Sequence, residues 1–256
     1  MTASRPLPVH HVMLGVDVRG SSARFRDDSL LPALRTAQTG LVAAALRQQG
    51  VDQDAYVLRS RGDGGRYEFL PGVSPVPVVE ALTGPLPSLL RRHNKQSSEA
   101  LELGLRLVTH GGYLVPAPDG GDADGADVNL LHGMLDAEEL RSALADSGAP
   151  YVLAVSEEIW NGVVRHGHGD LDPAAFEPAC LTVKGGATVT AWLSPEFRGH
   201  PQDDGASART TAAPHPRDTT GTGSPGQAEQ AGRGGITFQG RVKAKNVVSG
   251  DQWNIR

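Results

Sequence analysis

The sequence predicts an α+β sandwich: one mixed, largely antiparallel sheet with helices on one face. Segments with strand and helix patterns follow one another in the order β-α-β-β-α-β-β-α-β-α-β-β. Two pairs of strands, over residues 54–70 and 175–193, are each joined by a short turn rich in glycine. Helices that alternate with hairpins, rather than with single strands, favour α+β over a parallel α/β architecture.

The first half of this pattern begins with a buried strand over residues 9–18, whose apolar run ends at Asp17. Leucine and alanine then recur at helical spacing between Leu30 and Leu46, and Gly50 ends that helix. The hairpin over residues 54–70 follows, with glycines around its tip at residues 61–65. The tip carries one carboxylate among these glycines.

The second half contains three helical and five strand-like segments. A helix over residues 76–94 should break near Pro85 and Pro87, because proline lacks an amide proton and clashes with the preceding turn. The remaining expected elements are a strand over 101–109, a tight turn at Gly111–Gly112 into a short strand over 113–115, a loop over 117–126, a helix or two shorter helices over 127–144, a strand over 151–155, a helix over 156–164, and a hairpin of 175–183 with 187–193.

Composition excludes several classes of protein. The chain has 256 residues and one cysteine, Cys180, so it forms no internal disulfide and a reducing cytoplasm fits best. No apolar run approaches the ~18 residues of a membrane span, and the first residues lack a signal pattern, so no membrane association is expected. Acidic side chains outnumber basic ones over residues 1–197, which argues against a nucleic-acid partner.

Three regions follow from these patterns. Residues 1–197 form the α+β domain. Residues 198–235 contain no Val, Ile, Leu, Met, Phe, Trp or Tyr, so they cannot bury enough apolar surface to fold and are predicted to be a disordered linker. Residues 236–256 regain short β-prone apolar groups and form a separate C-terminal segment.

Two carboxylates stand at positions suited to a metal ion. Asp17 ends the first strand, and Asp63 lies at the tip of the glycine-rich hairpin. Paired carboxylates bind Mg²⁺ or Mn²⁺, and successive small residues after Asp17 offer backbone amides to an anion. The alternative is that Asp63 is an ordinary turn residue and Asp17 caps the next loop.

Four segments together resemble the class III nucleotidyl cyclase homology domain, over about residues 9–197. They are Asp17–Ser22, Gly62–Asp63, the spacing Asp122-x-x-Gly125-x-x-Val128-Asn129, and Val183-Lys184-Gly185. Ser21 replaces an aromatic residue of the first motif. The resemblance implies a ferredoxin-like sandwich and conversion of a nucleoside triphosphate to a 3′,5′-cyclic nucleotide and pyrophosphate.

The resemblance also implies roles for individual residues. Asp17 and Asp63 would hold two Mg²⁺ or Mn²⁺ ions, which lower the pKa of the attacking 3′ hydroxyl and neutralise the leaving oxygens. The amides of Val18, Gly20, Ser21 and Ser22 would cradle phosphate oxygens. The alternative for that segment is a plain turn of small residues.

The remaining site residues would contact the base, the ribose and the triphosphate. Arg59 and Asp122 would read the base, Asn129 would orient the ribose, and Lys184 would pair with the triphosphate. Adenylyl cyclases carry lysine at the position of Arg59, so the base stays open between adenine, guanine, cytosine and uracil. The alternatives are a solvated strand residue for Arg59, a polar helix-start residue for Asn129 and an exposed hairpin lysine for Lys184.

One position departs from the family. Four residues after Asn129 the family places an arginine that stabilises the transferring phosphoryl group, whereas this chain has Gly133. An arginine at a phosphoryl transition state is worth ~10³–10⁵ in rate in other systems. Arg19, Arg66 or His132 replaces it, or the protein is slow, or it binds nucleotide without turnover.

Two partnerships are implied. Sites of this family form between two subunits, so a homodimer is expected, with the metal carboxylates from one chain and the base, ribose and triphosphate contacts from the other. Residues 239–252 resemble the short amyloid-type, or RHIM-like, signalling motifs of bacterial effector proteins, which stack in cross-β ladders. The alternatives are a strand docked on the domain or a partner-binding peptide.

Overall fold

Seven strands form one sheet in the computed structural model, which describes residues 7–19, 30–61, 64–115 and 125–194. The strands are β1 (Val9–Val18), β2 (Tyr56–Arg61), β3 (Gly64–Phe69), β4 (Leu105–Leu114), β5 (Tyr151–Ser156), β6 (Glu177–Thr182) and β7 (Thr188–Ser194). Their order across the sheet is β2-β3-β1-β4-β5-β7-β6. β4 and β5 are parallel and the other neighbours are antiparallel, which confirms the predicted mixed sheet.

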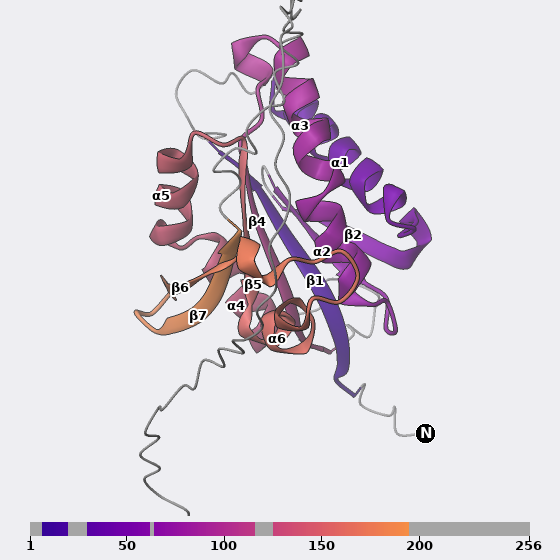
Figure 1. The fold of residues 1–256 in the computed structure, drawn as a ribbon, viewed down its shortest axis with the longest axis vertical. Helices are drawn as coiled ribbons and strands as arrows, with labels where there is room; N and C mark the ends of the chain where they lie inside the picture. The colour runs from indigo at the N-terminus through magenta and orange to yellow at the C-terminus, as the bar shows by residue number, and fades with distance from the viewer. Residues whose placement is uncertain (1–6, 20–29, 62–63, 116–124, 195–256) are drawn as a thin grey trace, which may run out of the picture. The chain divides into compact units, whose positions relative to one another are not determined.

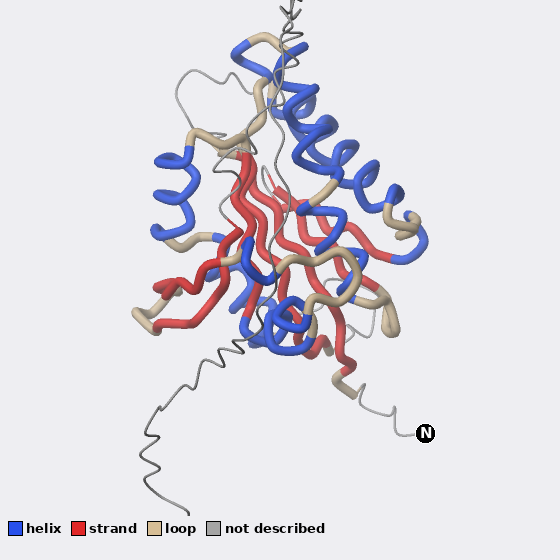
Figure 2. Tube along the Cα trace, in the orientation of Figure 1, coloured by secondary structure: helices blue, strands red, loops and turns tan. Residues whose placement is uncertain are grey.

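Within the described residues, six α-helices pack on this sheet (Figures 1 and 2). They are α1 (Leu31–Gln48), α2 (Pro75–Thr83), α3 (Pro85–Gln96), α4 (Ala126–Leu135), α5 (Glu138–Ser147) and α6 (Glu157–Gly162). The predicted break near Pro85 is confirmed, because Gly84 separates α2 from α3 and Pro85 begins the second helix. The sequence left open whether residues 127–144 form one helix or two, and the structure has two, α4 and α5.

The helices lie on both faces of the sheet, whereas the sequence predicted them on one. Alternate residues of β1, such as Leu14 and Val16, pack with α1, α2, α3 and α6. Met13 and Val108 point the other way and pack with α4 and α5. Figure 1 shows α5 and the α1–α3 group on opposite sides of the strands. The continuous apolar run in β1 is the physical reason, because a strand that is apolar on both faces needs cover on both.

β4 corrects a second prediction. It begins at Leu105, after a short 3₁₀ turn at Glu99–Leu101, and runs straight through Gly111–Gly112 instead of turning there. A Cβ on Gly111 would lie 2.9 Å from the Glu158 carboxyl group, and one on Gly112 would lie 2.5 Å from the Asp127 side chain. The two glycines therefore allow α6 and α4 to approach the strand closely.

The described residues all belong to the first of two units into which the chain divides, Met1–Asp204 and Gly205–Arg256. None of the helices in this described part combines the length and apolar character needed to cross a bilayer. The predicted linker at 198–235 and the segment 236–256 lie outside the described residues.

Candidate active site

Asp17 lies near the end of β1, beside the start of the hairpin strand β3. A Cβ on Gly64 would lie 3.3 Å from the Asp17 Cα and would also clash with the Val16 carbonyl oxygen. Only glycine permits this approach, so the strand that begins at Gly64 is packed directly against Asp17. Asp63 itself lies outside the described residues, as do Gly20, Ser21, Ser22 and Asp122.

The Asp17 carboxylate is engaged by an arginine that sequence reasoning did not single out. Arg106 of β4 is the register partner of Asp17, and its Nη2 donates a hydrogen bond to Asp17 Oδ2. Both side chains are largely buried, with exposed fractions of 13% for Arg106 and 15% for Asp17. The sequence signal was weak: Arg106 is the polar residue between Leu105 and Leu107, which places it on the opposite face from those leucines.

Val18 and Arg19 continue the chain after Asp17. The Val18 side chain is buried in the apolar core, so any contact of this residue with phosphate would come from its backbone amide, as predicted. The Arg19 amide donates to the Gly104 carbonyl oxygen at 2.6 Å, and the Arg19 side chain packs over Gly104. Arg19 therefore lies at the same end of the sheet as Asp17.

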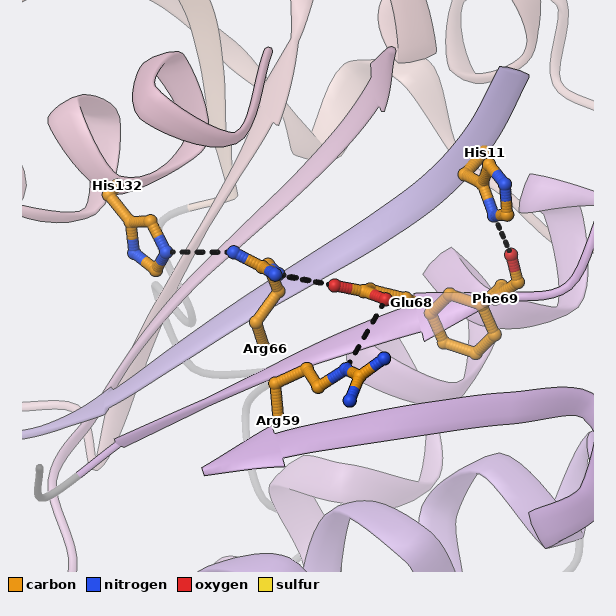
Figure 3. A network of polar contacts seen from close by, with 6 residues as sticks. All are labelled: His11, Arg59, Arg66, Glu68, Phe69 and His132. Carbon is orange, nitrogen blue, oxygen red and sulfur yellow. Dashed lines mark hydrogen bonds and ion pairs between the residues drawn. The ribbon is translucent and has the colours of Figure 1, made fainter. Parts of the chain in front are cut away.

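A network of charged side chains occupies β2 and β3 on the face that carries Asp17 (Figure 3). Glu68 Oε1 accepts hydrogen bonds from Arg66 Nε at 2.8 Å and Nη2 at 2.5 Å. Glu68 Oε2 lies 3.7 Å from Arg59 Nε. Arg66 and Glu68 are buried, whereas the Arg59 side chain is 29% exposed. Among the described residues, two guanidinium groups share this one carboxylate.

α4 presents Asn129 to solvent and directs His132 toward the network. Asn129 is exposed and His132, three residues later on the same side of the helix, is half-buried. Arg66 Nη1 donates to His132 Nε2 at 3.5 Å, since an arginine carries no acceptor. Figure 3 shows the His132 ring pointing from α4 to the Arg66 guanidinium.

Gly133 follows Asn129 by about one turn of α4. It is buried, and a Cβ there would lie 3.1 Å from Val183 Cβ. The position where the cyclase resemblance expects an arginine therefore packs against Val183, between β6 and β7. Arg19, Arg66 and His132 are the candidates to replace that arginine. His132 lies beside Gly133 on α4, and Arg66 of β3 contacts His132.

Lys184 lies in the exposed turn between β6 and β7, where the sequence predicted a hairpin. Gly185 and Gly186 have φ values of 94° and 82°, which favour glycine. The Val183 amide closes the turn on the Ala187 carbonyl oxygen at 2.9 Å. The turn holds the Lys184 ammonium group in solvent, available to an anionic ligand.

A second group of titratable residues lies at the other end of β4. Burial lowers the pKa of His110 below its ordinary value, although the charges of Asp127 and Glu158 oppose that shift. His110 Nε2 is 3.8 Å from Asp127 Oδ1, and neither ring nitrogen has a hydrogen-bond partner among the described residues. Asp127 also accepts a hydrogen bond from the Tyr113 amide at 2.6 Å, which anchors the start of α4 on the strand.

Asp17 is the described carboxylate that bears on a divalent metal site at this end of the sheet. No group of three or more His, Cys, Asp or Glu in the described ranges could hold an ion. Asp17 offers the hard oxygen that Mg²⁺ and Mn²⁺ prefer, at a partly exposed strand end. The residue therefore suits a metal as one ligand, and Arg106 donates a hydrogen bond to the same carboxylate.

No protein family profile matches the sequence, and no curated protein does. Solved structures do match. The guanylyl cyclase Cya2 superposes with a TM-score of 0.52 at 16% identity, over 78% of this chain and 98% of that one. An adenylate/guanylate cyclase/hydrolase from Silicibacter pomeroyi gives 0.50 at 16% identity, over 73% and 96%. A bacterial light-regulated adenylyl cyclase gives 0.52 at 12% identity, over 74% and 52%.

The fold is that of the nucleotide cyclases. This likeness confirms the cyclase-like α+β architecture expected from the motifs. At 12–16% identity it establishes the nucleotide cyclase-like fold alone, so the chemistry must be argued from the residues.

Proposed function

We propose that the chain is a nucleotide cyclase-like signalling protein that converts a nucleoside triphosphate to a 3′,5′-cyclic nucleotide and pyrophosphate. The observation that carries the proposal is Asp17 at the end of β1, packed against the first residue of β3, in a cyclase-like fold. The 3′ oxygen forms a bond to the α-phosphorus and loses its proton, while pyrophosphate leaves with the electrons of the broken bond.

Asp17 and Asp63 are the proposed ligands of two Mg²⁺ or Mn²⁺ ions, which would supply charge neutralisation at the attacking and leaving oxygens. The amides of Val18, Gly20, Ser21 and Ser22 bind phosphate oxygens in this proposal. Lys184 pairs with the triphosphate, and its exposed position on the hairpin turn supports that role.

Arg59 and Asp122 are the proposed base contacts, and Asn129 the ribose contact. Glu68 Oε2 lies 3.7 Å from Arg59 Nε, and this ion pair favours a fixed orientation of the Arg59 guanidinium. Because Asn129 is exposed on α4, it is available to a substrate held by a second chain. A homodimer that pairs Asp17 of one subunit with Asn129 of the other is therefore part of the proposal, as is a cytoplasmic location.

The test is incubation of the full-length protein with ATP, GTP, CTP and UTP in turn, in the presence of Mn²⁺. One cyclic nucleotide should form, and Asp63→Ala should abolish it. Asp136→Ala, which removes an exposed carboxylate between α4 and α5, is the matched control and should retain activity. Product formation that survives in Asp63→Ala would refute the assigned metal ligand.

The alternative function is a nucleotide-binding module without turnover that acts through residues 236–256. The buried Gly133 supports it, because no arginine reaches the substrate side of α4 from that position. Binding of a nucleotide with no cyclic product would favour this alternative. Comparing the assembly size of the full chain with a 1–197 truncation tests the C-terminal segment; equal sizes would contradict a protein partner or self-assembly through it.

A further inference from the structure

Arg106 lies on the central strand β4 and contacts Asp17, a proposed metal ligand on the neighbouring strand β1. The two residues are register partners on adjacent antiparallel strands, so their side chains leave the sheet from the same face. Arg106 Nη2 donates to Asp17 Oδ2, and the Arg106 Nε is buried without a hydrogen-bond partner among the described residues. Among the described residues, Arg106 forms an ion pair with Asp17.

The position of Arg106 is set by the backbone. The preceding residue donates its amide to the Pro150 carbonyl oxygen at 2.9 Å, and the strand is paired on both sides, with β1 and β5. Movement of the guanidinium away from Asp17 therefore requires rotation of the side chain, since the strand itself is fixed. Arginine stays protonated at every physiological pH, so its charge is always present beside this carboxylate.

A divalent metal on Asp17 would face that charge directly. Two cations on one largely buried carboxylate repel each other strongly, because the surrounding dielectric is lower than that of water. A charge-assisted hydrogen bond must also be given up if the metal takes the same oxygen.

We propose that Arg106 is an internal competitor for the Asp17 carboxylate: it occupies Asp17 in the metal-free protein, and a divalent metal binds by displacing it. The proposal rests on the proposed function for the identity of the metal site. It adds a residue that lowers the intrinsic metal affinity of the chain.

The experiment measures Mn²⁺ binding to the full-length protein by electron paramagnetic resonance, without nucleotide. Arg106→Gln keeps hydrogen-bonding groups and removes the charge, and it should bind Mn²⁺ about tenfold more tightly than the natural chain, the size of one charged hydrogen bond. Asp17→Asn should lose this binding. Arg141→Gln changes the net charge equally but removes an exposed arginine paired with Asp136 and Glu138, so it should leave the affinity unchanged.

Unchanged or weaker Mn²⁺ binding by Arg106→Gln, with binding by the natural chain lost in Asp17→Asn, would overturn the competitor role and leave the metal site standing. Absence of Asp17-dependent binding in every variant would overturn both this inference and the metal ligands of the proposed function. If Arg106→Gln does not fold, Arg106→Lys keeps the charge but not the planar fork. It should show a smaller increase in affinity, and no increase would count against the proposal.

Discussion

The two faces of the sheet differ in what they bury. The face under α1, α2, α3 and α6 is lined by Leu14, Val16 and Leu107 among other apolar side chains. The opposite face is apolar under α4 and α5, but over β3, β1 and β4 it carries Arg66, Glu68 and the Asp17–Arg106 pair. Charges are buried only at a cost in solvation, so we expect the apolar side chains of the first face to contribute more to stability than the charged pairs of the second.

The largest expected loss of stability comes from a substitution on the apolar face. Leu107→Ala removes a fully buried side chain in the centre of β4 and should lower the free energy of unfolding by about 4 kcal/mol, because it leaves a cavity. Urea unfolding of the described domain measures this. Leu7→Ala, at a side chain that is 78% exposed, is the control and should change little. If Leu107→Ala lowers the free energy of unfolding no more than Leu7→Ala does, the larger contribution of this face to stability is contradicted.

The next effect concerns the charged face. Glu68→Leu leaves the buried Arg66 guanidinium without its carboxylate and should cost about 3 kcal/mol of unfolding free energy. The double variant Arg66→Met with Glu68→Leu should recover most of that loss, since neither charge remains buried. Urea unfolding and nucleotide binding are measured on both variants.

If the double variant regains stability but loses nucleotide binding, the pair serves the site and not the fold. A double variant that is as unstable as the single one would show instead that the pair stabilises the sheet.

A smaller effect depends on pH. His110 has a lowered pKa in the folded chain, so the unfolded chain binds more protons once the pH falls through about 6.5. Stability should therefore decline from about pH 7.5 to about pH 5.5, by less than the loss in Glu68→Leu. His110→Phe removes this proton linkage, and its unfolding free energy should vary less over the same range. An equal decline in both proteins would assign the pH effect to other groups.

The smallest effect on stability is expected at the solvent side of α4. Asn129→Ala should change the unfolding free energy by less than about 0.5 kcal/mol, because the side chain is exposed. It should nevertheless weaken nucleotide binding about tenfold through a lost hydrogen bond. Calorimetric titration measures the binding, with the exposed amide Gln48→Ala on α1 as control. Unchanged nucleotide affinity would remove Asn129 from the site.

Local patterns predicted most of the elements correctly. The proline-induced break between α2 and α3 and the hairpins around Gly64 and Gly185 follow from local sequence, and the order of helices and hairpins predicted the mixed sheet. The turn at Gly111–Gly112 was wrong because those glycines accommodate α4 and α6, which are distant in sequence. Glycine alone does not reveal whether it serves a turn or a close approach.

The candidate site divides in the same way. The sequence by itself determined that Asp17 ends an apolar strand, that Lys184 lies on a glycine turn, and that no arginine follows Asn129 at the spacing of the cyclases. Only the tertiary structure decided that Arg106 holds Asp17, that Arg66 reaches His132, and that Gly133 faces Val183. Strand register and helix placement bring these residues together across 50 to 89 positions of the chain, and such long-range pairing leaves no local pattern in a single sequence.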